Sequence, residues 1–182
     1  MGQYYKAILL AEKDEQQAHE FIRAFILAFT GQKLMEHSYI DDPFVKCVES
    51  LLTPEGMFYK TRLVWAGDYA DVEANQEKNL YQIADEDKNA QKELLTRTLV
   101  SADYRYILNH TKQLYVDKNK CKNTIHPLPL LTAEGNGRGG GDYRGTNLEL
   151  VGSWARDVIS VERVMPNHFT ELVCGFGDDE TY

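Results

Sequence analysis

The stretch "ADYRYILNHTKQLYVDKN", residues 102–119, decides the fold. Apolar and aromatic residues alternate with polar ones on both sides of the tetrapeptide "NHTK", residues 109–112. Alternation with a period of two is typical of half-buried strands, and a short polar segment between two such strands is typical of a hairpin turn. The sequence therefore predicts an antiparallel β-hairpin with its tip at residues 109–112.

Other segments extend this pattern into a sheet. Residues 3–11, "QYYKAILLA", and residues 57–67, "MFYKTRLVWAG", are rich in aromatic and aliphatic residues and are predicted as strands. Residues 147–164 and 168–176 are predicted as the last two strands. Residues 124–131, "TIHPLPLL", are expected to be extended, because two prolines two positions apart disfavour a helix.

Helices are expected beside these strands. Residues 12–30 carry apolar residues at three- and four-residue steps, and residues 41–52 begin with aspartates followed by Pro43 at a first helical position. The polar segment at residues 73–100 reads as a helical excursion or a loop. The sequence thus predicts one α+β domain, residues 1–182, with a frayed C-terminal tail. Its mixed or antiparallel sheet has about five to seven strands, with two or three helices packed on it.

Composition limits the classes of function. The chain of 182 residues has a formal net charge of -8 and is 43% hydrophobic. This acidic balance argues against a protein that coats nucleic-acid phosphates or adsorbs to anionic membranes. The amino terminus lacks the apolar stretch of a signal peptide, and the three cysteines are scattered, which is typical of reduced thiols. We therefore expect a cytoplasmic protein that binds neither a nucleic-acid polymer nor a membrane.

The glycine loop, which we define as residues 135–147, "GNGRGGGDYRGTN", is the stretch least typical of ordinary scaffold. Glycine lets backbone N–H groups converge on an anion, and arginine offers forked donors for phosphate. Asp142 can accept from a ribose hydroxyl or a base edge, and Tyr143 can stack on a base. The residues predicted to bind a ligand here are Gly137, Arg138, Gly139, Gly140, Gly141, Asp142, Tyr143 and Arg144. The alternative is a flexible connection, since the spacing matches neither a Walker A motif nor the dinucleotide fingerprint.

Further candidates lie at the predicted hairpin tip and at a strand end. His110, beside a hydroxyl and an ammonium group, suits phosphate binding or acid–base chemistry, and Asn109 and Lys112 would assist it. Trp65, at the end of its predicted strand, is a further candidate for ligand contact. The alternative for the polar tetrapeptide is a plain turn.

Asp68 and Asp71 follow the strand predicted at residues 57–67. Two carboxylates three positions apart can help to hold a divalent cation or position a water, but hard cations need more oxygen ligands than this stretch offers. Turn and capping roles are the alternative. The sequence predicts no resident metal and no cofactor.

Several strings together resemble a group of small accessory proteins encoded by tailed bacteriophages and prophages. The strings are "MGQYYK", "LMEHSYI", "VWAGDYAD", "YILNHTK", "IHPLPLLT", "GNGRGGGDYRGTN" and "VGSWARD". These strings are spread over most of the chain, but none of them is a motif of known chemistry. The resemblance implies an anti-defence role in an infected bacterium, and some proteins of this class sequester or destroy nucleotide second messengers.

Three hypotheses about function follow. The first is a binding module that captures a small phosphate-bearing or nucleotide-type ligand, such as an immune second messenger, without turning it over; a homo-oligomer would suit such a sponge. The second is a metal-dependent phosphoesterase or nucleotide hydrolase, for which the catalytic candidates are Asp68, Asp71, His110 and Asp142. The third is an acidic inhibitor that docks on a host defence protein. The first is preferred, because no complete catalytic motif is recognisable.

Overall fold

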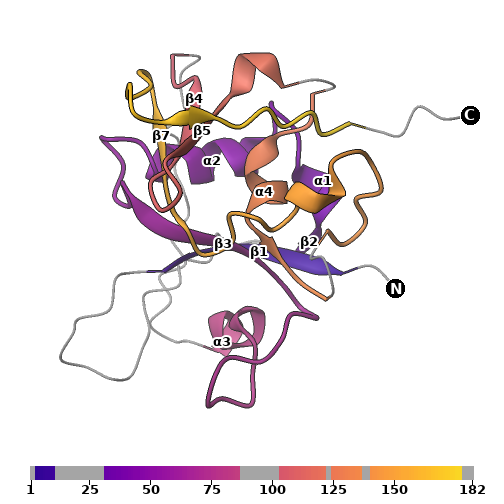
Figure 1. Ribbon diagram of the computed structural model, residues 1–182. Helices are drawn as coiled ribbons and strands as arrows, with labels where there is room; N and C mark the ends of the chain where they lie inside the picture. Colours follow the sequence, from indigo (N-terminus) through magenta and orange to yellow (C-terminus); the bar gives the residue numbers. More distant parts are fainter. Residues whose placement is uncertain (1–2, 11–30, 87–102, 122–123, 137–139, 178–182) are drawn as a thin grey trace, which may run out of the picture.

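A computed structural model describes residues 3–10, 31–86, 103–121, 124–136 and 140–177 (Figure 1). In chain order its elements are β1 (Tyr4–Leu10), β2 (Gln32–Lys33), α1 (Leu34–His37), α2 (Pro43–Leu51), β3 (Thr61–Gly67), α3 (Leu80–Glu86), β4 (Tyr106–Asn109), β5 (Leu114–Asp117), η1 (Lys118–Lys120), α4 (Pro127–Leu131), β6 (Ala133–Glu134), η2 (Leu148–Leu150), β7 (Val158–Glu162) and β8 (Thr170–Glu171). The predicted α+β class is confirmed.

The strands of the described residues form one mixed, eight-stranded sheet in the order β2-β1-β3-β7-β4-β5-β8, with β6 paired to β3. β6 and β7 share one edge of β3: β7 pairs with its first residues and β6 with its last. The pairs β3–β6 and β5–β8 are parallel, and the others are antiparallel. The sheet has one strand more than the predicted upper number. The strands without a sequence prediction are β2 and β6, which have two residues each and therefore too few positions for alternation to show.

The predicted hairpin is confirmed. β4 and β5 pair antiparallel, with Asn109 opposite Leu114, and the turn between them contains Gln113 at a φ of 55°. On its other side β4 pairs with β7, where Leu108 lies opposite Ser160. The alternation in residues 102–119 therefore predicted the pairing, and β7 extends it into the sheet.

Both faces of β1 and β3 are buried over most of their length. Helices α1, α2 and α4 lie on one side of these strands and α3 on the other (Figure 1). Leu9, Leu63 and Trp65 belong to the larger core, whereas Ile8 and Val64 belong to a second cluster with residues of α3. No helix in the described part of the chain is long and apolar enough to cross a membrane.

Helix α2 begins where the sequence predicts it. The Asp42 carboxylate accepts from the N–H groups of Phe44 and Val45 at 2.8 and 3.2 Å, and Pro43 occupies the first helical position. Because an N-cap side chain satisfies N–H groups that have no partner in the helix, Asp42→Ala is expected to lower the free energy of unfolding by about 1 kcal/mol. Urea denaturation measures this loss. The conservative Asp42→Asn should retain most of the stability, and equal losses in both variants would contradict the capping role.

The prediction for residues 124–131 is wrong: they contain helix α4 instead of an extended segment. Pro127 and Pro129 both lie in the first turn of α4. N–H groups in the first turn have no acceptor within the helix, so the missing donors of the two prolines cost nothing there. His126 caps this turn by accepting from the N–H of Leu128 at 3.1 Å.

The last two predicted strands are shorter than expected. Residues 147–157 form η2 and successive turns, and β7 occupies only the second half of the predicted range 147–164. Arg156 has a φ of 66°, which is incompatible with a strand at that position. Helix α3 lies within the polar segment 73–100, whereas the helix predicted at residues 12–30 lies outside the described residues.

A buried ion cluster joins α2, η1 and the start of α4. The Glu49 carboxylate, 3% exposed, accepts from Nζ of Lys118 at 2.6 Å, and Nε2 of His126 lies 3.1 Å from it. Burial alone would raise the pKa of Glu49, but His126 and Lys118 together bring the pKa below its ordinary value. This cluster fixes three separate segments to one another beside the larger core.

Candidate functional site

The described flanks of the glycine loop are anchored on two sides. Tyr143 is buried, and its hydroxyl donates to the carbonyl of Thr146 at 2.6 Å and accepts from the N–H of Gly177 at 3.2 Å. Asp142 accepts from the N–H of Met35 in α1 at 3.0 Å. The flanks are therefore built into the fold, which disagrees with a connection that nothing stabilises. Three predicted site residues lie outside the described residues: Gly137, Arg138 and Gly139.

Two glycines of the loop lie directly against Gln3 and Tyr5, at the start of β1. A Cβ atom on Gly141 would be 2.6 Å from the ring of Tyr5, and the φ of Gly141 is 56°. A Cβ atom on Gly135 would be 2.7 Å from the side-chain amide of Gln3. At Gly141 both the Tyr5 ring and the positive φ favour glycine, whereas a Cβ atom on Gly135 would require the end of the Gln3 side chain to shift.

Three charged groups from two segments, the glycine loop and the turn after β3, influence Tyr5. Burial, Asp142 and Asp68 raise the pKa of Tyr5 well above its ordinary range, and Arg144 opposes them. Asp68 is held in place because it accepts from the N–H of Tyr4 at 3.0 Å. The structure therefore brings together three of the predicted site residues, Asp68, Asp142 and Arg144, around a tyrosine that remains neutral.

The side chain of Gln3 lies beneath the same loop with an unused donor. Its Oε1 accepts from the Tyr5 hydroxyl at 2.7 Å, but its Nε2 has no hydrogen-bond partner among the described residues. Gln3 is only 7% exposed. A buried amide nitrogen without an acceptor costs free energy, so each such group calls for an explanation.

Arg144 is exposed beside this cluster. Its Nη1 donates to the carbonyls of Gly141 and Tyr143 at 2.8 and 2.9 Å. Within the described part of the chain, Nε and Nη2 make no hydrogen bond, and they carry the remaining donors of the guanidinium fork. The loop carbonyls therefore orient Arg144 while leaving donors for an acceptor in solution.

The polar residues of the hairpin tip are engaged in the fold. Asn109 is fully buried and donates to Asp157 at 2.7 Å, and Nζ of Lys112 forms an ion pair with the same carboxylate. Nε2 of His110 lies 2.8 Å from Oγ of Ser160, and burial lowers the pKa of His110. These contacts agree with the alternative to ligand binding for residues 109–112, which is a plain turn.

The four catalytic candidates are not brought together. The N–H of His110 donates to the carbonyl of Val158, which pairs with Arg62 near the start of β3. Asp68 directly follows the end of β3, and six residues of extended chain separate it from Arg62, about 20 Å. A single reacting group cannot contact both His110 and the Tyr5 cluster at this separation.

Asp68 and Asp71 are the carboxylates that follow β3. Asp71 is exposed, just after the turn that begins at Asp68. In the described ranges, no group of three or more histidine, cysteine, aspartate or glutamate side chains is placed to hold a metal ion. Among these residues the pair therefore has no third such side chain beside it, whereas a hard cation takes six or more oxygen ligands.

Trp65 belongs to the core. Its side chain is fully buried, and its indole N–H donates to Nε2 of His37 at 2.7 Å. The two rings stack at 5.8 Å, and Phe44 packs edge-on against both. The hydrogen bond satisfies both polar ring atoms involved, so Trp65 serves packing and presents no face to solvent.

Gln3 and Tyr5 are the site residues that sequence reasoning missed. Both sit in an ordinary strand pattern, and nothing local marks them, because their position under the loop depends on pairing between β1 and β3. The density of glycines indicates close backbone approach, which the sequence analysis assigns to a ligand and not to Gln3 or Tyr5. In comparisons with protein-family models, curated proteins and solved structures, the chain matches none of them.

Proposed function

We propose that the protein binds and sequesters a small phosphate-bearing or nucleotide-type ligand at the glycine loop, without turning it over. In the setting that the resemblance to phage accessory proteins implies, this ligand is an immune second messenger of the infected bacterium. The observation that carries the proposal is the buried, unpaired Nε2 of Gln3 beneath a loop that also presents Arg144.

The chemistry of the cluster fits such a ligand in three ways. The Gln3 amide needs an acceptor such as a base carbonyl or ring nitrogen. The free donors of Arg144 suit a phosphate oxygen. The carboxylates of Asp68 and Asp142 each use one oxygen for a backbone N–H, so the other oxygen can accept from a ribose hydroxyl or a base amino group. Donors and acceptors together favour a nucleotide over a simple inorganic anion.

Arg144→Ala is expected to weaken ligand binding at least about tenfold, because it removes a charge-assisted hydrogen bond. Isothermal titration with the ligand identified below measures the change. The matched control is Arg163→Ala, since Arg163 is also exposed and contacts Glu55 and the Tyr104 ring instead of the glycine loop. Equal affinities of the Arg144 and Arg163 variants would contradict the assignment of the site.

Gln3→Glu tests the buried donor separately. One carboxylate oxygen of the glutamate can still accept from the Tyr5 hydroxyl. The other oxygen, which replaces Nε2 of Gln3, cannot donate a hydrogen bond unless the carboxylate is protonated. Binding should therefore fall while thermal unfolding stays cooperative. Gln3→Glu binding as tightly as the wild type would remove the Gln3 amide from the site.

The experiment that identifies the ligand uses a mixed panel of nucleotides, cyclic dinucleotides and cyclic ADP-ribose-type molecules. The protein is incubated with the panel, separated from unbound compounds, denatured and analysed by mass spectrometry. A compound that is depleted and recovered intact supports sequestration. A new product would point to the enzyme hypothesis instead, and a panel left unbound would redirect the search to host proteins.

A further inference from the structure

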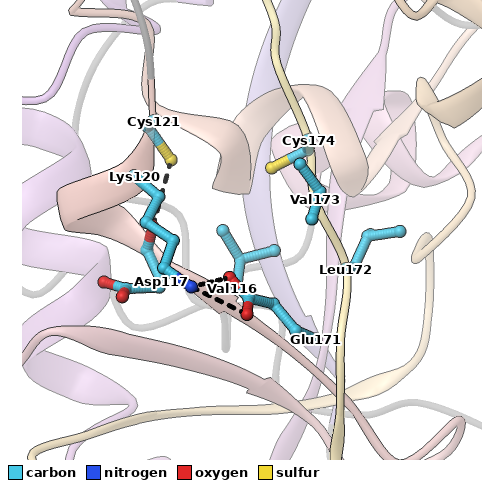
Figure 2. Close-up of a pocket in the computed structure, with 8 residues that line it drawn as sticks. All are labelled: Val116, Asp117, Lys120, Cys121, Glu171, Leu172, Val173 and Cys174. Carbon is cyan, nitrogen blue, oxygen red and sulfur yellow. Dashed lines mark hydrogen bonds and ion pairs between the residues drawn. The ribbon is translucent and has the colours of Figure 1, made fainter.

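Cys121 and Cys174 come together at one end of the β5–β8 pair. Cys121 follows η1, directly after β5, and Cys174 lies three residues beyond β8. Both line a small cavity of about 10 Å³ (Figure 2), which has room for one water-sized molecule. Figure 2 shows the Cys174 sulfur directed from the C-terminal segment toward the side of the cavity that Cys121 occupies.

The two thiols are near enough to shift each other's pKa. The neighbouring Cys174 thiol and, to a lesser extent, Lys118 lower the pKa of Cys121, whereas burial and Asp117 oppose them. The Cys121 thiol and burial raise the pKa of Cys174. The Cys121 thiol in turn lies 3.7 Å from the carbonyl of Asp117. Cys121 is partly exposed and Cys174 is buried, so the more accessible thiol is also the better nucleophile.

Cys47 provides an internal contrast. It is also a partly exposed free thiol, but burial and the nearby Asp42 raise its pKa. Thiolate character controls reactivity toward peroxides, so Cys47 is the less reactive of the two partly exposed cysteines.

We propose that Cys121 and Cys174 form a peroxide-sensitive thiol pair that closes reversibly to a disulfide. The Cys121 thiolate attacks one oxygen of hydrogen peroxide; the S–O bond forms, the O–O bond breaks, and the leaving hydroxide takes a proton to become water. The Cys174 sulfur, losing its proton, then attacks the Cys121 sulfenic acid; the S–S bond forms, the S–O bond breaks, and a second water leaves. The two thiols are oxidised by two electrons, and the peroxide is reduced to two waters.

Closure would fasten the C-terminal segment at residues 172–177 to η1. The carbonyl of Gly175 accepts from Thr146 and Asn147, and Gly177 bonds to Tyr143, so this segment also borders the glycine loop. The bridge would join residues 53 positions apart (174 minus 121), which strongly restricts the unfolded chain. The inference concerns the thiols alone and stands whether or not the loop binds a ligand.

The test exposes the reduced full-length protein to a small excess of hydrogen peroxide, followed by alkylation, intact-mass measurement and peptide mapping. The wild type and Cys47→Ser are expected to lose the mass of two hydrogen atoms and yield one cross-linked peptide pair containing Cys121 and Cys174. A dithiol reductant should restore the reduced mass. Oxidation should also raise Tm by roughly 5–10 °C.

Cys174→Ser should stop at a sulfenic acid on Cys121, which a cyclic diketone probe captures. Cys174→Ala gives the same readout if the serine variant does not fold. Separate alkylation of Cys121 and Cys174 in the peroxide-treated wild type would overturn the proposal, as would oxidation of Cys47 ahead of Cys121.

Discussion

Replacing Glu49 with glutamine is expected to lower the free energy of unfolding by about 3 kcal/mol or more, because it breaks a buried ion pair from one side. The Glu49 carboxylate is 3% exposed, and the Lys118 side chain that pairs with it is 14% exposed. Glutamine has nearly the same shape, so the loss reports the charge of Lys118 left without its partner. Chemical denaturation at neutral pH measures it.

The same cluster predicts an acid dependence of stability. The pKa of Glu49 in the folded protein lies below its ordinary value of 4.5, so its contribution is fully present above that pH and is lost as pH falls through the folded pKa. The free energy of unfolding of the wild type should therefore fall more steeply below about pH 4.5 than that of Glu49→Gln.

Glu86→Gln is the matched control for both measurements. Glu86 also pairs with a lysine, Lys78, but the two side chains are 61% and 46% exposed. Exposed pairs contribute about 0–1 kcal/mol, so this variant should stay close to the wild type. Similar losses from Glu49→Gln and Glu86→Gln would show that burial of the first pair does not govern its contribution.

The parts of the fold that the sequence predicts are those fixed by local rules. The hairpin is encoded by alternation around residues 109–112, and α2 by the cap at Asp42 with Pro43 after it. Helix α4 was missed because a general rule against proline in helices does not hold in the first turn. The two-residue strand β6 depends on pairing with β3, which no local pattern reveals.

In the candidate site, too, local sequence features were predictable and contacts between distant segments were not. The density of glycines predicts close backbone approach to a ligand, which stays a prediction. The structure shows that Gly135 and Gly141 lie close to Gln3 and Tyr5 of the protein itself. The grouping of His110 with Asp68 was not possible to judge from sequence, because the distance between them is set by the length of β3 and the pairing of its two ends. Pairing between distant segments therefore decides which polar residues share a site.

Alanine substitutions at three glycines of the loop are expected to distinguish the steric need for glycine in the fold from a role in ligand binding. A Cβ atom on Gly145 would be 1.7 Å from the carbonyl oxygen of Gly177, and a Cβ atom on Gly140 would be 3.4 Å from Val151, an ordinary contact. Gly145→Ala must displace backbone, so it should lower the free energy of unfolding by about 3 kcal/mol. Gly140→Ala should leave the free energy of unfolding nearly unchanged.

Gly141→Ala should fall between these two variants. Its Cβ atom would meet the Tyr5 ring at 2.6 Å, and alanine is strained at a φ of 56°, so we expect a loss of about 1–2 kcal/mol. Because Gly141 and Tyr5 both belong to the proposed ligand site, this variant should also weaken ligand binding more than Gly140→Ala does. Thermal unfolding and ligand titration of the same three proteins separate the two effects. Equal stability of all three variants would mean that the loop is not packed against Tyr5 and Gly177. This result would contradict the proposed ligand site, because the site depends on that packing.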